Sequence, residues 1–135
     1  MRPAPHLYRH RVRYADTDQM GVVYHARYLE WFEAARTEML RDQGLPYKRL
    51  EEAGVSLPVI EAYCRYRFPV RYDDLVEVAT QMGERSGLRF RLDYEVRVEN
   101  DPALRIEGYT WHCYVGRHGR PIRPPAEFAD FFERL

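Results

Sequence analysis

The chain has 135 residues, a length that suits one domain with its own buried core. Lys plus Arg and Asp plus Glu each number 21, so the formal net charge is zero, which argues against general nucleic-acid binding. No apolar run reaches the roughly 18 residues that a membrane-spanning helix needs. The N-terminus carries no signal pattern. We therefore expect a cytoplasmic protein in which Cys64 and Cys113 are reduced.

The first predicted elements are a strand and a long helix. Alternating residues over 7–14 predict the strand, and a turn over 16–21 follows. The residues expected on the inner face of this strand are Tyr8, His10, Val12 and Tyr14. The helix is predicted from Tyr24 to Gln43, with one apolar face at three- and four-residue spacing. The residues of that face are Tyr28, Trp31, Phe32, Ala35 and Met39. Gly44 and Pro46 stop the helix.

The remainder of the chain predicts a short helix over 46–53 and then strands. The four expected strands cover residues 57–68, 75–82, 88–99 and 103–115, with turn-rich separators at 69–74, 83–87, 100–102 and 116–119. Short connections between long strands favour antiparallel hairpins. A last helical turn or two is expected within 125–135.

This order of elements predicts an α+β fold in a single domain that covers residues 1–135. The long helix is the only predicted element with an apolar face large enough to cover the sheet. A curved antiparallel sheet wrapped around one long central helix is the hotdog fold, which we therefore expect.

The segment that joins the first strand to the long helix concentrates the chemistry. Two carboxylates, Asp16 and Asp18, precede Gly21 and His25 within ten residues. The first N–H groups of a helix lack internal partners, and the helix dipole places partial positive charge there. Such a site binds an anion or polarises a carbonyl that becomes an oxyanion.

The same segment resembles a known family. The matching residues are Tyr14-x-Asp16-Thr17-Asp18-x-x-Gly21-Val22-Val23-Tyr24-His25-x-x-Tyr28, followed by Glu33-x-x-Arg36-x-Glu38. This pattern resembles the signature of the 4-hydroxybenzoyl-CoA thioesterase family. The similarity is strongest to its bacterial acyl-CoA thioesterase branch, which is often associated with the Tol-Pal envelope system. Weaker similarity continues to about Arg123.

The resemblance implies an acyl-CoA thioester hydrolase with Asp18 as its catalytic carboxylate. It also implies that Tyr14 and His25 belong to the active site, and that the segment with Gly21, Tyr24 and His25 binds the thioester carbonyl through a backbone N–H. One departure is visible, because Arg27 stands where the family often has Asn.

Further implications concern the substrate and the assembly. The family pattern places Arg85 and Ser86, expected at a turn, near the coenzyme A phosphates. It implies a homodimer with the active site between subunits, commonly paired into a homotetramer. Coenzyme A belongs to the substrate, so we expect no cofactor. The acyl group, and coenzyme A versus an acyl-carrier protein as its bearer, stay open.

The chemistry of a thioester fits this small set of groups. A cysteine-like leaving thiol has a pKa near about 8.5, so a strong general acid is not required. Asp18 can attack the carbonyl to give a mixed anhydride, or it can activate a water molecule. The residues do not choose between these routes. The sequence lacks the Gly-x-Ser-x-Gly motif of serine hydrolases, which leaves the carboxylate route.

The same residues admit other interpretations. Asp16 is better explained as a turn or helix-capping residue. A calcium loop fails because Met20 and Arg27 occupy positions that need oxygen ligands, and we expect no metal site. Two alternative functions remain. One is a non-catalytic acyl-CoA-binding protein. The other is an enoyl-CoA hydratase, whose family pattern sets its acid and His five residues apart, whereas Asp18 and His25 are seven apart.

Overall fold

A computed structural model describes residues 4–135 and shows five strands and three α-helices within them. The elements are β1 (His6–Arg11), the 3-10 turn η1 (Tyr14–Asp16), α1 (Arg27–Asp42), α2 (Tyr47–Glu52), β2 (Val59–Tyr66), β3 (Leu75–Ser86), β4 (Arg89–Val98), β5 (Asp101–His112) and α3 (Ala126–Arg134). The strands form one antiparallel sheet in the order β1-β3-β4-β5-β2, so β1 and β2 are its two edges.

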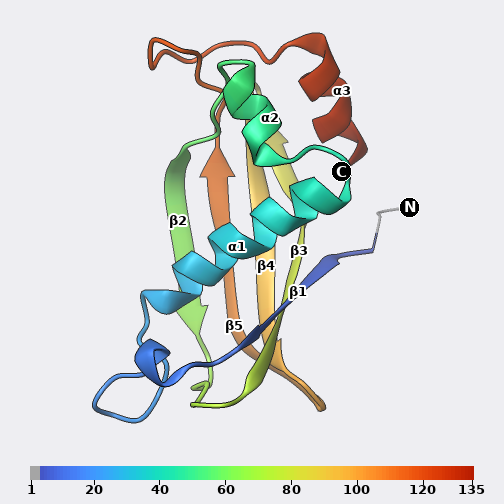
Figure 1. The fold of residues 1–135 in the computed structure, drawn as a ribbon. Coiled ribbons are helices and arrows are strands. Elements are labelled where there is room, and N and C mark those ends of the chain that lie inside the picture. Colours follow the sequence, from blue (N-terminus) through green and yellow to red (C-terminus); the bar gives the residue numbers. More distant parts are fainter. Residues whose placement is uncertain (1–3) are drawn as a thin grey trace.

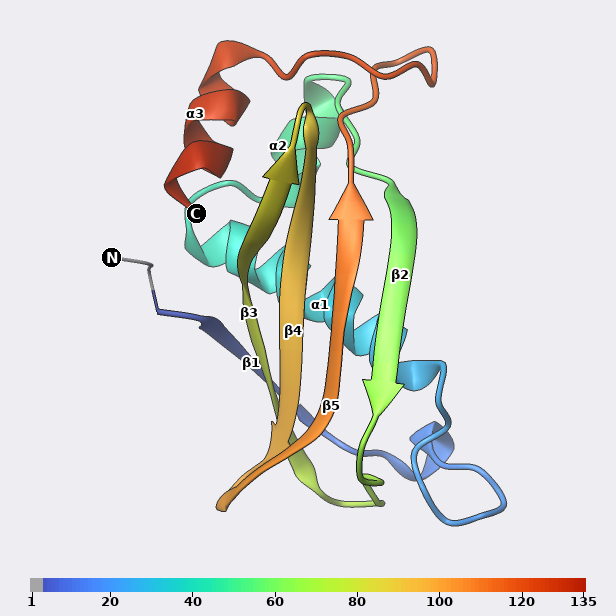
Figure 2. The ribbon, with the colours of Figure 1, turned by 180° about the vertical axis from the view of Figure 1, so that it is seen from behind.

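The sheet curves around α1, which crosses one face diagonally (Figure 1). No helix of residues 4–135 covers the opposite face, which Figure 2 shows from behind. The predicted apolar face of α1 is buried in full. At its centre the ring of Phe32 stacks on Tyr94 of β4, with centroids 4.2 Å apart. Gly108 of β5 permits this approach, since a Cβ there would lie 2.7 Å from the Phe32 ring. The predicted α+β hotdog fold is confirmed.

The C-terminal helix α3 adds to the core more than the sequence suggested. Its three phenylalanines, Phe128, Phe131 and Phe132, are buried. The Phe132 ring lies 5.0 Å from that of Phe90, at the start of β4. The expectation that the long helix alone covers the sheet is therefore wrong, because α3 closes the end of the sheet that α1 does not reach (Figure 1).

Two predicted turns lie in strands instead. The turn expected over 83–87 is confined to Gly87 and Leu88, and β3 continues through a bulge to Ser86. Gly83 has a packing role, because a Cβ there would lie 2.4 Å from the Asp93 carboxylate of β4. The turn expected over 100–102 is likewise shorter, and β5 begins at Asp101.

The first strand ends earlier than predicted. β1 stops at Arg11, and the chain turns into η1, where the Asp16 N–H donates to the Arg13 carbonyl (3.0 Å). Tyr14 therefore leaves the inner face on which the alternation placed it, and it is 79% exposed. This turn starts the segment that carries the candidate site.

Candidate active site

Residues 17–23 form a small hairpin that presents Asp18. Thr17 and Val23 pair as an isolated antiparallel bridge. The Asp18 N–H donates to the Val22 carbonyl (2.9 Å), and the Gly21 N–H donates to the Asp18 carbonyl (3.0 Å). Gly21 has a φ of +77°, a left-handed conformation that glycine adopts without steric cost. Gly21 thus shapes the hairpin, and its N–H is used within it.

The Asp18 carboxylate is half-buried and lines a cavity of about 290 Å³ at the start of α1. His25, Tyr28 and Tyr66 line the same cavity. Oδ1 of Asp18 accepts the Met20 N–H (2.8 Å), which fixes the orientation of the carboxylate. For Oδ2 no hydrogen bond occurs within residues 4–135. One oxygen is therefore anchored and the other can meet a substrate or a water molecule.

Asp16 has a different environment two residues earlier. Its side chain is 1% exposed, and Oδ2 accepts hydrogen bonds from His10 Nε2 (2.9 Å) and the Arg13 N–H (2.8 Å). Burial alone would raise the pKa of Asp16, but the hydrogen bonds from His10 and Arg13 outweigh it and hold the pKa below its ordinary value. The geometry fits the structural role expected for Asp16.

The N–H groups at the start of α1 differ in whether they are already bonded. The Tyr24 N–H donates to the Asp16 carbonyl (2.9 Å), so it is occupied by the loop itself. In the described part of the chain, no acceptor takes the His25 N–H. Of the three residues expected to meet the thioester carbonyl, Gly21 and Tyr24 have engaged N–H groups, and His25 offers the free one.

Tyr14, expected in the active site, lies outside the cavity. Its exposed ring packs edge-on against Tyr72 with centroids 5.6 Å apart, and it does not line the cavity that Asp18 and His25 share.

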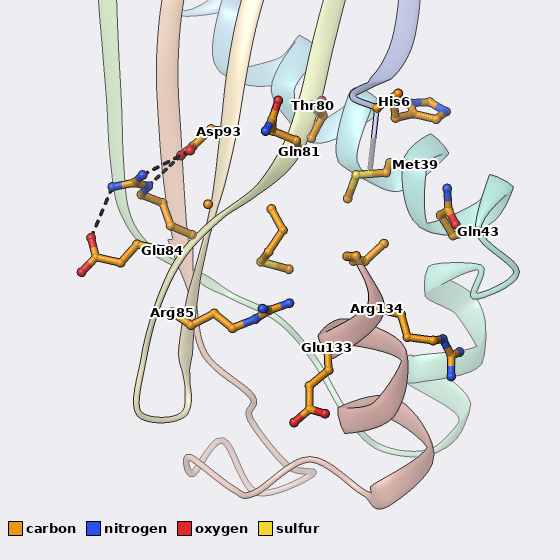
Figure 3. Close-up of a pocket in the computed structure, with 15 residues that line it drawn as sticks. His6, Met39, Gln43, Thr80, Gln81, Glu84, Arg85, Asp93, Glu133 and Arg134 are labelled. Atoms are coloured by element: carbon orange, nitrogen blue, oxygen red, sulfur yellow. Dashed lines mark hydrogen bonds and ion pairs between the residues drawn. The ribbon is translucent and has the colours of Figure 1, made fainter. Parts of the chain in front are cut away.

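Arg85 and Ser86, expected near coenzyme A, are the last two residues of β3, whose end lies away from the loop between β1 and α1 (Figure 1). The Arg85 guanidinium donates to the Phe132 carbonyl of α3. Arg85 lines a separate cavity of about 690 Å³ between β3 and the ends of α1 and α3 (Figure 3). Ser86 and Arg89 line another, of about 740 Å³. Within one copy of the chain, neither Arg85 nor Ser86 joins Asp18.

Tyr66, at the end of β2, was not singled out by the sequence. Its hydroxyl donates to the His25 carbonyl (3.2 Å), and its ring lies edge-on to the His25 imidazole with centroids 6.3 Å apart. Partial burial, together with the neighbouring Cys64 thiol, raises the pKa of Tyr66 to about 12. No local signal marks this residue, because tyrosine is common in strands and the contact spans 41 positions.

Arg27 ties the first turn of α1 to the loop before it. Nη1 forms an ion pair with Glu30 (2.8 Å), and Nη2 donates to the Ala15 carbonyl (3.4 Å). Arg27 therefore braces the segment that holds Asp18, at the position where the resembling family often has Asn.

Neither a metal cluster nor a membrane span was found among residues 4–135. No three His, Cys, Asp or Glu side chains gather so as to hold a metal ion there. No described helix is both long and apolar enough to cross a bilayer.

The sequence model of the thioesterase-like superfamily matches residues 12–132, which include the Asp18 hairpin and the whole sheet from β2 to β5. The chain belongs to this superfamily. The predicted relationship to the 4-hydroxybenzoyl-CoA thioesterase group is thereby confirmed.

Individual relatives extend over nearly the whole chain. An acyl-CoA thioesterase, YbgC, of Haemophilus influenzae is 45% identical over 126 residues, which cover 93% of this chain and 92% of the relative. A putative acyl-CoA thioesterase, YneP, of Bacillus subtilis is 36% identical over 89% of this chain and 87% of its own length. The solved DHNA-CoA thioesterase of Staphylococcus aureus superposes with a TM-score of 0.87 at 32% identity, over 95% of this chain and 86% of the other.

Proposed function

We propose that this member of the thioesterase superfamily hydrolyses acyl-CoA thioesters, with Asp18 as the catalytic carboxylate. The observation that carries the proposal is the meeting of two groups at one cavity. Oδ2 of Asp18 and the unengaged His25 N–H belong to residues that line the same space at the start of α1. The names of the Haemophilus and Bacillus relatives support this activity and substrate class.

In the proposed reaction, the thioester carbonyl oxygen accepts the His25 N–H at the positive end of the α1 dipole. Asp18 takes a proton from water, the water oxygen adds to the acyl carbon, and the carbon–sulfur bond breaks. The thiolate leaves and receives the proton that Asp18 took from water, which restores the carboxylate and gives a free carboxylic acid and a thiol. The covalent route also balances: Asp18 attacks the acyl carbon and expels the thiolate, and water then hydrolyses the mixed anhydride.

The side chain of His25 has a supporting part in this proposal. Its imidazole lies beside the Asp18 cavity and packs against Tyr24, with ring centroids 4.5 Å apart. We assign it to the orientation of substrate or water, or to protonation of the leaving thiolate. Tyr14 receives no role, since its ring packs on Tyr72 outside the cavity.

We also propose that the active protein is a homodimer joined along β2. This edge strand exposes apolar side chains, including Val59 and Ile60. An uncovered edge with apolar side chains is a site of association. Two identical edges related by a two-fold axis must pair antiparallel. The homotetramer expected from the resemblance would then arise by pairing of such dimers.

Antiparallel pairing would bring the separated parts of the site together. It places the Ser86 end of one copy at the end of the sheet where the partner subunit carries its Asp18 hairpin. The cavity of about 740 Å³ lined by Ser86 and Arg89 would then receive the coenzyme A part of a substrate whose acyl group lies beside Asp18 of the partner subunit. This arrangement reconciles the coenzyme A contact expected of Ser86 with its distance from Asp18 within one chain, whereas Arg85 lines a different cavity.

The first experiment measures thiol release with a chromogenic disulfide from short, long and aromatic acyl-CoAs. The panel includes a dihydroxynaphthoyl-CoA, because the Staphylococcus relative acts on that class. We expect wild type to cleave at least one class and Asp18→Asn to lose at least about 100-fold in kcat. A folded Asp18→Asn variant that keeps the wild-type rate would refute the assignment of Asp18.

The same panel separates the rival functions. Tight acyl-CoA binding without thiol release would favour a non-catalytic binding protein. Loss of enoyl absorbance from crotonyl-CoA would favour a hydratase. Activity only on acyl-carrier protein would change the bearer of the acyl group but keep the chemistry.

Two further proposals concern the cellular location of the protein and its need for a cofactor. We infer a cytoplasmic location because Cys64 and Cys113 are both free thiols, as a reducing compartment favours. We expect no metal or organic cofactor, so prolonged treatment with a chelator should leave thiol release unchanged.

A further inference from the structure

The residue Tyr66 is the least expected member of the cavity that holds Asp18. It comes from the last position of β2, on the side of the strand that faces α1, and reaches the turn where α1 begins. Its ring lies 5.6 Å from that of Tyr28 and 6.3 Å from that of His25. Tyr66 thus connects the edge strand with the site.

The bond that Tyr66 makes acts on a peptide group at the site. Its hydroxyl donates to the His25 carbonyl (3.2 Å), the oxygen of the peptide whose other end is the Ala26 N–H. No residue from 4 to 135 accepts the Ala26 N–H. A donor on a carbonyl draws electron density from the peptide group and makes its N–H a stronger donor.

The preceding peptide group has the same arrangement. The Tyr24 carbonyl accepts the Arg27 N–H (2.9 Å), which polarises the His25 N–H. Both peptide groups that flank the His25 side chain therefore carry a donor on their oxygens. The first donor belongs to the start of α1 itself, whereas the second is supplied only by Tyr66, from a distant strand.

We propose that Tyr66 is a positioning residue of the thioesterase site, whose hydroxyl holds the His25–Ala26 peptide and thereby fixes the orientation of the adjoining His25 N–H, the proposed donor to the thioester oxygen. This inference rests on the proposed function. Tyr66 acts through the backbone and needs no proton transfer of its own.

The test compares Tyr66→Phe with Tyr63→Phe. Both residues are tyrosines of β2 with similar exposure, 47% and 42%, but Tyr63 faces the other side of the sheet and stacks on Tyr109. Loss of the Tyr66 hydroxyl should lower kcat by about 3- to 10-fold, the effect of one hydrogen bond, and leave KM within about two-fold. Tyr63→Phe should retain the wild-type kcat and KM.

A spectroscopic measurement distinguishes positioning from a general structural effect. The carbonyl stretch of a ¹³C-labelled thioester bound to Asp18→Asn reports polarisation without turnover. Adding Tyr66→Phe should move the stretch toward its frequency in water, while adding Tyr63→Phe should not. Circular dichroism checks folding, and Tyr66→Met provides a second variant without a hydroxyl, expected to match Tyr66→Phe in kcat.

Failure of the Tyr66 proposal can be distinguished from failure of the proposed thioesterase function. A wild-type protein that cleaves no thioester would overturn the proposed function itself. An active wild type, an impaired Asp18→Asn variant and a Tyr66→Phe variant with unchanged kcat and carbonyl frequency would overturn only the role of Tyr66. A rise in KM alone would also overturn it, because it would place Tyr66 in substrate binding.

Discussion

Asp16 and Asp18 show how two identical side chains, two positions apart, acquire different tasks. Asp16 is enclosed and accepts hydrogen bonds from His10 and Arg13. Asp18 sits on a hairpin that lines the cavity, with one oxygen held by the Met20 N–H and the other without a hydrogen bond within residues 4–135. The difference arises because the chain reverses at η1 and buries the first carboxylate against β1, while the hairpin carries the second outward.

This contrast gives a matched pair of variants. Asp16→Ala should lower the free energy of unfolding by about 2–4 kcal/mol, since it leaves His10 and the Arg13 N–H without their buried acceptor. Asp18→Ala should change it by less than about 1 kcal/mol, because its carboxylate is only half-buried. Urea unfolding at neutral pH measures both, with thiol release recorded in parallel. Equal stability losses in the two variants would contradict the division of tasks.

At the scale of the elements, strand β5 carries a series of buried, hydrogen-bonded polar side chains whose contribution to stability depends on pH. His112 is 1% exposed; its Nε2 meets the Thr110 hydroxyl (2.7 Å), and its Nδ1 meets the Leu57 carbonyl (3.1 Å). The Thr110 hydroxyl also meets the Tyr94 hydroxyl of β4 (2.7 Å). Burial lowers the pKa of His112 from 6.5 to about 4. The ring is therefore neutral, and this chain fastens the two central strands to the segment before β2.

The lowered pKa of His112 predicts how stability changes with pH. Between pH 6.5 and about 4 the unfolded state binds a proton that the folded state excludes, so folding weakens as pH falls through this window. Urea unfolding at about pH 7 and about pH 4.5 should show a loss of up to roughly 3 kcal/mol from this group. His112→Gln should reduce the dependence, whereas His118→Gln, at an exposed turn, should not. An equal pH dependence in all three proteins would show that His112 is not responsible.

The elements also show which sequence signals were reliable. The helix face of Tyr28, Phe32 and Met39 was predicted correctly because a helical period is repeated over many residues. The end of β3 was predicted wrongly because Gly83 was taken as a turn signal. That glycine instead leaves room for the Asp93 side chain on the next strand, a requirement that comes from the sheet and not from the local sequence.

For the assembled molecule, the decisive question is whether one site uses two copies of the chain. Asp18→Asn removes the carboxylate, and Ser86→Asp places a negative charge in the cavity assigned to coenzyme A. In a dimer with shared sites, a mixed pair of these variants has one site with both defects and one with neither. An equimolar mixture, unfolded and refolded together, should regain about a quarter of wild-type activity by random pairing.

Two controls sharpen this experiment. Each variant refolded alone should stay nearly inactive, and simple mixing without refolding should restore less if the dimers exchange slowly. A mixture that never exceeds the mean of its parents would show that Asp18 and Ser86 do not serve one site across a subunit boundary. Sedimentation at the assay concentration gives the number of copies directly.

The chain sequence alone determined the elements and the chemistry of one short segment. Local periodicity encodes α1 and most of the strands, and the run from Asp16 to His25 carries its carboxylates, glycine and helix start within one stretch. The hotdog fold was predicted from the order of these elements, and thioesterase membership from the family resemblance of the Tyr14–Glu38 segment; both are confirmed.

The tertiary structure decided which of these groups meet. In the folded chain the Tyr24 N–H donates to the Asp16 carbonyl, whereas the His25 N–H has no acceptor within residues 4–135. The fold also brings the Tyr66 hydroxyl to the His25 carbonyl. It also placed the end of β3, which carries Arg85 and Ser86, away from the loop between β1 and α1 (Figure 1). These relations depend on contacts between residues distant in sequence. Such contacts are set by how α1 and the sheet pack together, and no spacing within a local motif encodes them.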